Sequence, residues 1–262
     1  MLWRFVQAAI AVAALALAGF FLLAPAIVEN SANKIVPASI KVSDRAIALH
    51  KTLTIADLHS DSLLWKRNLT ERSDRGHMDL PRLRDGNVAL QVFSSTTKSP
   101  KGQNYDANSG DTDNITLLAV AQMQPPQTWN SLLQRSLWHA EKLRVADESD
   151  ADLMIIRTQT DMEGLLLARR SGKPLMGALL SIEGLHNLEG KRENLDALFK
   201  AGFRMAGFAH FFDNEVSGSM HGEKKGGLTP LGRDIFRDME AKGMVIDIAH
   251  ASHAAVAEML AM

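Results

Sequence analysis

With 262 residues, 46% of them hydrophobic, the chain is long enough for one large domain or two small ones with a full core. Its 29 Lys and Arg residues balance 30 Asp and Glu residues, and no basic run is interleaved with aromatic side chains, so no nucleic-acid partner is expected. Cysteine is absent, which excludes disulfides, thiol nucleophiles and cysteine-based zinc sites.

An uncharged stretch from Ala8 to Val28 follows Arg4 near the start of the chain. Its length of about twenty residues suits a helix that crosses a bilayer. The positive flank favours an orientation in which everything after Glu29 lies outside the cytoplasm, on the periplasmic or extracellular face. Ala24-Pro25-Ala26 also fits the Ala-x-Ala pattern of a cleaved signal peptide. Residues 1–29 are therefore predicted to be a membrane anchor or a signal peptide.

Residues 30–50 are predicted to be a linker, and residues 51–262 to form the folded domain. Within that domain, short apolar runs alternate with longer amphipathic stretches, which is the pattern of βα units around a parallel sheet. The apolar runs are Ile55–His59, Val88–Ser94, Leu153–Ile156, Met176–Glu183, Arg204–His210 and Val245–His250.

Capping residues and prolines mark where the helices should begin, break and end. Thr229 is predicted to cap a helix that has Pro230 at its first position and Gly243 after its last turn. The longest helical candidate, Asn114–Glu148, is predicted to break at Pro125-Pro126.

A short internal repeat supports a barrel. Lys200-Ala201-Gly202-Phe203 leads to His210, and Ala241-Lys242-Gly243-Met244 leads to His250, each as helix, glycine, strand and histidine. Polar residues at the carboxyl ends of successive strands are typical of a (β/α)8 TIM-type barrel. A doubly wound open sheet gives a similar pattern, but more often carries a glycine-rich turn after its first strand, and none is present.

The chain from Thr54 onward provides roughly 210 residues, whereas an eight-stranded barrel uses about 250. The predicted fold is therefore an α/β barrel that is incomplete at its C-terminal end. We expect about six of the eight βα units, preceded by an N-terminal hydrophobic helix.

Five candidate ligands share one position in this pattern, at the end of an apolar run: His59, Asp61, Glu183, His210 and His250. Imidazole and carboxylate groups are ligands that zinc prefers in cysteine-free sites. Two histidines, an aspartate and a glutamate can hold two metal ions if one carboxylate bridges them.

Strand parity places His59 and Asp61 on the same side of their run, two residues apart. Asp57 has the same parity. Two roles are open for it: an acceptor of a hydrogen bond from the His59 imidazole, which would orient that ring, or a purely structural residue. His50, His77, His139 and His253 are interpreted as surface or core residues, whereas His186 and His221 lie in loops that could reach the site.

From about Thr54 to its end, the chain resembles the membrane (renal) dipeptidases, zinc peptidases built on an amidohydrolase-type barrel. Asp57-Leu58-His59-Ser60-Asp61 resembles the family's Asp-Gly-His-Asn-Asp, and Ser181–His186 is similar to its Val-Glu-Gly-Gly-His segment. Gly207–His210, Gly227–Gly232 and Val245–His250 resemble three further motifs of the family.

The resemblance implies hydrolysis of dipeptides by a water molecule that bridges two Zn²⁺ ions. It implies that His59, Asp61 and Glu183 hold the first zinc, that Glu183 and His250 hold the second, and that His210 contacts the substrate and stabilises the tetrahedral intermediate. It also implies that the chain lacks the family's next zinc histidine, a substrate-binding arginine and a late aspartate. Residues 213–219 differ from the family's Asn-x-x-Ala-Asp segment, so no dipeptide preference is implied.

Two alternatives remain open at this point. The chain could be a truncated, non-catalytic, membrane-tethered module, because an open barrel exposes strand edges and an apolar interior. It could also be a related barrel hydrolase that acts on a lactone or a phosphoester, since a fold does not determine its substrate. The sequence leaves the oligomeric state open, a homodimer included.

Overall fold

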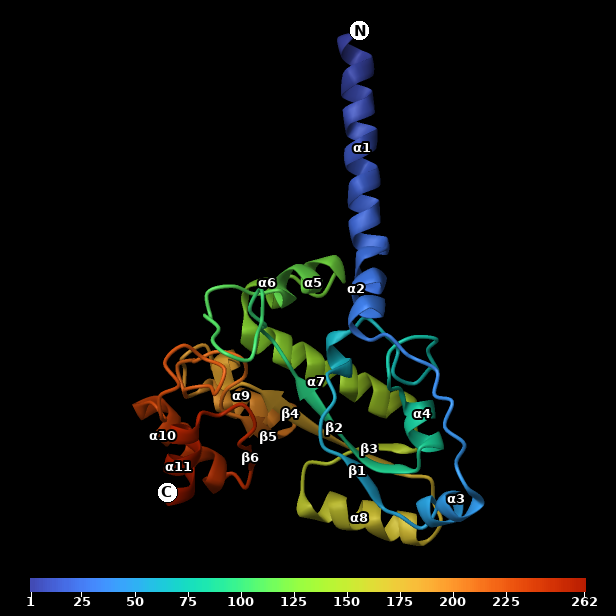
Figure 1. Cartoon of the computed structure of the whole chain (residues 1–262), viewed down its shortest axis with the longest axis vertical. Helices are drawn as coiled ribbons and strands as arrows, with labels where there is room; N and C mark the ends of the chain where they lie inside the picture. The colour runs from blue at the N-terminus through green and yellow to red at the C-terminus, as the bar shows by residue number, and fades with distance from the viewer.

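Six parallel strands form the centre of the protein, whose computed structural model describes residues 1–262. Helices cover the outer side of this sheet, and the N-terminal helix projects away from the domain (Figure 1). The strands are β1 (Ile55–Asp57), β2 (Val88–Ser95), β3 (Leu153–Ile155), β4 (Met176–Glu183), β5 (Phe203–Gly207) and β6 (Val245–Asp247). Parallel strands alternating with helices confirm the predicted α/β fold, an incomplete TIM-type barrel.

The strand order is β1-β2-β4-β5-β6, with β3 paired to β4 outside this path. β2 runs along one edge of β4, from Gly177 to Ile182. The other edge of β4 is shared, because β3 pairs with Met176–Ala178 and β5 pairs from Leu180 onward. β3 therefore does not lie between β2 and β4, where a simple alternation of βα units would place it.

The chain contains eleven helices. They are α1 (Leu2–Leu22), α2 (Ala24–Ala32), α3 (Asp44–His50), α4 (Leu80–Asp85), α5 (Ile115–Ala121), α6 (Gln127–Asn130), α7 (Leu132–Ser149), α8 (Gln159–Arg170), α9 (Asn194–Ala201), α10 (Pro230–Ala241) and α11 (His253–Ala261). Two 3-10 turns, Ser62–Leu64 and Leu185–Leu188, follow β1 and β4. Among the helices, α7 packs on β2 and β3, α9 on β5 and α10 on β6.

The helix signals in the sequence are confirmed. Thr229 caps α10, and its side-chain oxygen accepts the Gly232 N–H at 3.0 Å. The stretch from Asn114 to Glu148 breaks at Pro125-Pro126, and a second break at Ser131 separates α6 from α7. Residues 30–50, expected to be a linker, contain the end of α2 and all of α3.

The α1 helix has 21 residues, a mean hydropathy of 2.3 in its most apolar window and no buried residue. At about 1.5 Å per residue it is roughly 32 Å long, which matches the hydrocarbon core of a bilayer. It is therefore long and apolar enough to cross a membrane, and a signal sequence would have the same properties.

Three strands end earlier than the sequence predicts. β1, β5 and β6 stop at Asp57, Gly207 and Asp247, so the histidines expected at their ends lie two or three residues further on, in loops. At β1 and β6 the cause is the final aspartate. Its Oδ1 accepts the N–H two residues later, from His59 at 3.2 Å and from Ala249 at 2.8 Å, and this local hydrogen bond turns the chain out of the sheet.

One buried histidine gives the domain a pH-dependent stability. His139 on α7 is fully enclosed, and its Nδ1 lies 2.8 Å from the Ser95 hydroxyl. Burial lowers its pKa from 6.5 to about 3, helped by the positive charges of Lys142 and Arg135. Because the unfolded state binds the proton first, the free energy of unfolding should fall by up to about 1.4 kcal/mol per pH unit as the pH drops from 6.5 toward 3.

Urea unfolding at pH 6.5, 5.5 and 4.5 measures this slope. His139→Gln should make it less steep, whereas the same change at His50, which is exposed at the end of α3, should not. An identical slope in wild type and His139→Gln would contradict the assignment.

Candidate metal centre

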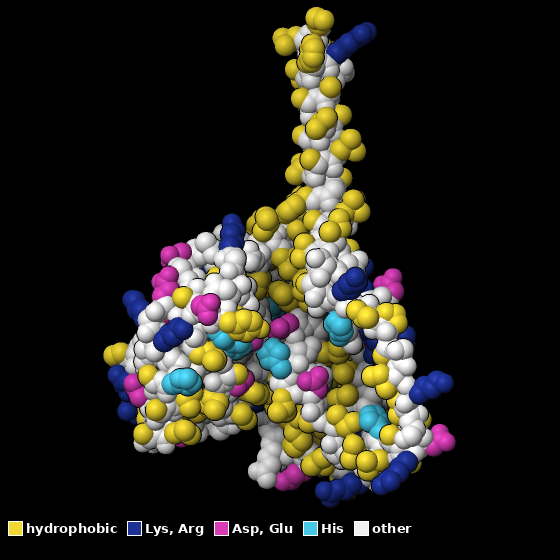
Figure 2. All heavy atoms as spheres, in the orientation of Figure 1, with side chains coloured by type: hydrophobic (Ala, Val, Ile, Leu, Met, Phe, Trp, Pro, Cys, Tyr) yellow, Lys and Arg dark blue, Asp and Glu magenta, His cyan; other side chains and the backbone are white.

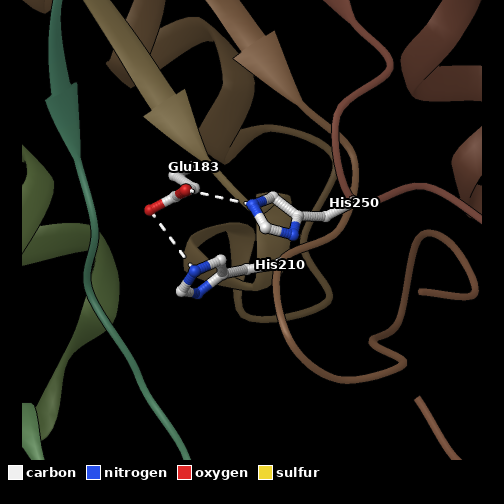
Figure 3. A group of neighbouring side chains, drawn as sticks. All are labelled: Glu183, His210 and His250. Atoms are coloured by element: carbon white, nitrogen blue, oxygen red, sulfur yellow. Dashed lines mark ion pairs between the residues drawn. The ribbon is translucent and has the colours of Figure 1, made fainter. Parts of the chain in front are cut away.

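Glu183, the last residue of β4, lies at the centre of a cluster at the carboxyl ends of the strands. His210 and His250 approach its two carboxylate oxygens from the loops after β5 and β6 (Figure 3). His59 and Asp61 reach the same carboxylate from the loop after β1. All five candidate ligands therefore come together, although they span almost 200 positions of the chain.

The distances within the cluster are nearly equal. The Nε2 atom of His250 is 3.4 Å from Glu183 Oε1, and that of His210 is 3.4 Å from Glu183 Oε2. The His59 Nε2 atom lies 3.6 Å from Glu183 Oε1 and 3.5 Å from Asp61 Oδ1. These contacts exceed the range of about 2.7–3.2 Å for an N–H···O hydrogen bond.

Such spacing matches two ligands of one cation. Two atoms bound tetrahedrally at zinc, each at about 2.0–2.1 Å, are roughly 3.3 Å apart. The cluster contains two groups of three ligands whose donor atoms lie within 4.8 Å of one another: His59 with Asp61 and Glu183, and Glu183 with His210 and His250. Glu183 belongs to both groups, so the donor set fits two metal ions that share one carboxylate.

His210 is predicted to contact the substrate. In the structure its Nε2 also stands as close to Glu183 as that of His250 does. The Asp57 carboxylate accepts the backbone N–H of His59 and not the imidazole N–H, because the chain turns at this residue.

Two backbone positions shape the loops that carry the ligands. Gly184 has φ +89, and a Cβ there would lie 2.6 Å from the His186 ring. This glycine lets the chain leave β4 immediately after Glu183. His250 itself adopts φ +63, a left-handed conformation that is rare for residues other than glycine. Its carbonyl accepts the Met220 N–H at 2.8 Å, which helps to hold this conformation.

Thr96, directly after β2, is a site residue that the sequence reasoning missed. Its hydroxyl oxygen lies 2.5 Å from Asp61 Oδ1 and 2.6 Å from Glu183 Oε2. One hydroxyl has one proton, so it can donate to only one of the two carboxylates at a time. The rule used for the other ligands, a polar side chain at a strand end, would have found it.

The electrostatics of the cluster favour a bound cation. Burial acts to raise the pKa of Glu183, but the nearby imidazoles of His250 and His210 and the hydrogen bond from the Thr96 hydroxyl outweigh it and hold that pKa at about 2. The nearby carboxylate of Asp61 raises the pKa of His59 to about 9, against the effect of burial. Burial lowers the pKa of His210. Two carboxylates thus face a largely neutral His210, and a proton on His59 partly balances their charge.

A cleft of about 510 Å³ opens onto this cluster. Asp61, Glu183 and His210 line its polar side, and Trp65 and Leu118 are among its apolar walls. On the face shown in Figure 2, histidine and acidic side chains gather in a hollow below the base of the N-terminal helix. The cleft is large enough for a ligand of a few residues.

Solved structures share this fold. The probable dipeptidase PvdM of Pseudomonas aeruginosa superimposes with a TM-score of 0.62 at 17% identity, over 83% of this chain and 52% of the other. A metallopeptidase of Rhodobacter sphaeroides, solved with a phosphinate mimic of the dipeptide L-Ala-D-Ala, gives a TM-score of 0.57 at 19% identity, over 79% of this chain and 62% of the other.

Curated relatives are dipeptidases. Dipeptidase tcpJ of Claviceps purpurea is 29% identical over 188 residues, or 71% of this chain and 39% of the relative. An uncharacterised dipeptidase of Schizosaccharomyces pombe is 29% identical over 208 residues, or 76% of this chain and 46% of the relative. The chain thus spans less than half the length of these two relatives. The family described as Membrane dipeptidase (Peptidase family M19) matches residues 43–262. The chain belongs to the membrane dipeptidase family.

Proposed function

We propose that this protein hydrolyses dipeptides with the help of two zinc ions. The observation that carries the proposal is the position of Glu183, whose carboxylate belongs to two separate groups of ligand atoms. The family match and the dipeptidase relatives support the choice of substrate. The absence of a thiol in the chain and the histidine and carboxylate donors at the site agree with zinc and with a water nucleophile.

Each ligand has a proposed place. His59, Asp61 and Glu183 hold the first zinc, and Glu183 and His250 contribute to the second. When bound, such a pair of ions supplies an activated water at neutral pH and polarises the peptide carbonyl. Thr96 keeps the carboxylates of Asp61 and Glu183 in place through its short contacts with both.

His210 is proposed to act on the substrate. Its side chain is only 8% exposed, and burial lowers its pKa, so the ring is neutral and keeps one N–H to donate. A neutral imidazole beside the shared carboxylate is suited to donate this hydrogen bond to the oxyanion that develops on the substrate carbonyl.

The proposed location follows from α1. As an anchor, α1 would leave residues after Glu29 on the periplasmic or extracellular face, consistent with the basic Arg4 that precedes the apolar stretch. The metal centre would then face substrates outside the cytoplasm.

The proposal is tested by metal removal. Purified protein should hydrolyse simple dipeptides, lose this activity when dialysed against a chelator, and regain it when zinc is added back. A chelator already saturated with zinc is the control and should leave the activity unchanged. Turnover that survives the chelator, or no turnover with zinc supplied, would refute the proposed function.

A further inference from the structure

The α2 helix, which continues from the membrane helix α1, is held on the domain by a buried carboxylate. Glu29 in α2 is only 2% exposed. Its Oε2 atom accepts a hydrogen bond from Arg75 Nε at 3.1 Å, and its Oε1 atom contacts Arg67 Nε. Both arginines belong to the loop between β1 and α4, so this ion pair joins the start of the chain to the folded domain.

The domain side of this contact is a cationic pocket. Arg67 donates from Nη1 to the Met78 carbonyl at 2.9 Å, and its guanidinium lies on Gly76, where an added Cβ would come within 2.7 Å of Cζ. The neighbouring Lys142 is half-buried and donates to the carbonyls of Leu63 and Trp65, both at 2.6 Å. Buried cations are stable only when they are paired, and Glu29 supplies the negative charge at this place.

The same helix borders the cleft over the metal centre. Val28, which precedes Glu29, and Ala32, one helical turn further on, line this cleft. Its opposite side is lined by Asp61, Glu183 and His210. Leu64, Trp65, Ile115 and Leu118 complete its apolar side. In Figure 2 apolar side chains surround the base of the N-terminal helix, directly above the hollow with the histidines.

We propose that α2 is a wall of the substrate site: Val28 and Ala32, together with Trp65 and Leu118, form a subsite for an apolar side chain of the substrate, and Glu29 is the positioning residue that fixes this wall. The proposal rests on the proposed dipeptidase function. Such a subsite favours dipeptides with a large apolar side chain over those built from glycine. Cleavage after Ala26 would leave Val28, Glu29 and Ala32 on the mature chain.

The kinetic test compares hydrolysis of Leu-Leu and Gly-Gly by the full chain in detergent micelles. Val28→Asp places a carboxylate on the apolar wall and should lower the ratio of kcat/KM values, Leu-Leu over Gly-Gly, by about tenfold, chiefly through KM. The matched control is Ile27→Asp, one residue earlier on α2, which is 63% exposed and outside the cleft. This control should keep the wild-type ratio.

The structural test does not depend on turnover. Hydrogen exchange should be slow at the amides of residues 24–32 in the wild type and at least tenfold faster in Glu29→Gln, which removes the charge that pairs with the arginines. Glu29→Gln should also reproduce the lowered Leu-Leu preference, as expected of a residue that acts through α2.

Three results separate the possible failures. If wild type cleaves Gly-Gly and Val28→Asp keeps the wild-type ratio, the subsite is wrong and the dipeptidase function stands. If the amides of residues 24–32 exchange as fast in wild type as in Glu29→Gln, Glu29 does not fix α2 on the domain. If wild type cleaves neither dipeptide with zinc supplied, the dipeptidase function fails and the subsite fails with it.

Discussion

Glu183→Gln should remove most of the metal and lower dipeptide hydrolysis by about 10³-fold or more. The carboxylate of Glu183 is the one ligand that both three-residue groups share, and three histidines approach it within 3.6 Å. An amide keeps the shape but loses the charge and one anionic oxygen. In hydrolysis by the proposed metal centre, several kcal/mol of transition-state stabilisation would come from the metal, and about 4 kcal/mol corresponds to a factor of 10³ in rate.

Two measurements check this expectation, the zinc content per chain after dialysis and kcat/KM for a simple dipeptide. The control is Glu215→Gln, which makes the same chemical change at an exposed residue in the loop between β5 and α10. It should leave both quantities unchanged. A Glu183→Gln protein that retained two tightly bound zinc ions and wild-type turnover would show that the shared carboxylate is not the centre of the site.

Arg135→Met should lower the free energy of unfolding by about 3–5 kcal/mol. Arg135 on α7 is 2% exposed, and its guanidinium donates five hydrogen bonds of 2.6–3.0 Å. The acceptors are the carbonyls of Thr97, Thr128 and Trp129, the Asp113 carboxylate and the Thr116 hydroxyl. Methionine fills much of the volume but leaves a partly buried carboxylate without its partner and several buried carbonyls without donors.

Urea unfolding at neutral pH measures this loss. Arg144→Met, on the same helix, is the matched control, because Arg144 forms ion pairs with Glu141 and Glu148 on the exposed side of α7. Pairs of this kind contribute little to stability, so the control should unfold at nearly the wild-type urea concentration. Equal midpoints for the two variants would contradict the role assigned to Arg135. Arg135→Lys should resemble the methionine variant, since an ammonium group cannot reproduce the five-donor fork.

The features that depend on local chemistry could be predicted from the sequence. The bounds of β4 were predicted correctly, because an apolar run ends at a carboxylate followed by glycine. The helix of residues 230–241 follows its capping threonine and first-position proline as expected. Polar residues at the ends of parallel strands were expected to converge. The structure brings the five predicted ligands into one cluster: His59, Asp61, Glu183, His210 and His250.

The features that depend on partners far away in the chain could not be predicted. β3 pairs with the same edge of β4 as β5 does. This choice depends on which edge of β4 is free in the folded sheet, and no local sequence pattern encodes it. Glu29 looks like the first polar residue after a membrane segment, and only the folded domain shows that Arg67 and Arg75 enclose it. The turn made by Asp57 was missed because the parity argument assumed that the strand continues to His59.

β4 pairs along both edges with three other strands, and it is the strand that ends in Glu183. A backbone held in this way has little conformational entropy left to lose when a ligand binds. His59 and His250 are instead placed by loops that leave the sheet at an aspartate. The ligands of the centre are therefore held in different ways. A strand paired along both edges holds Glu183, and loops hold His59 and His250 beside it.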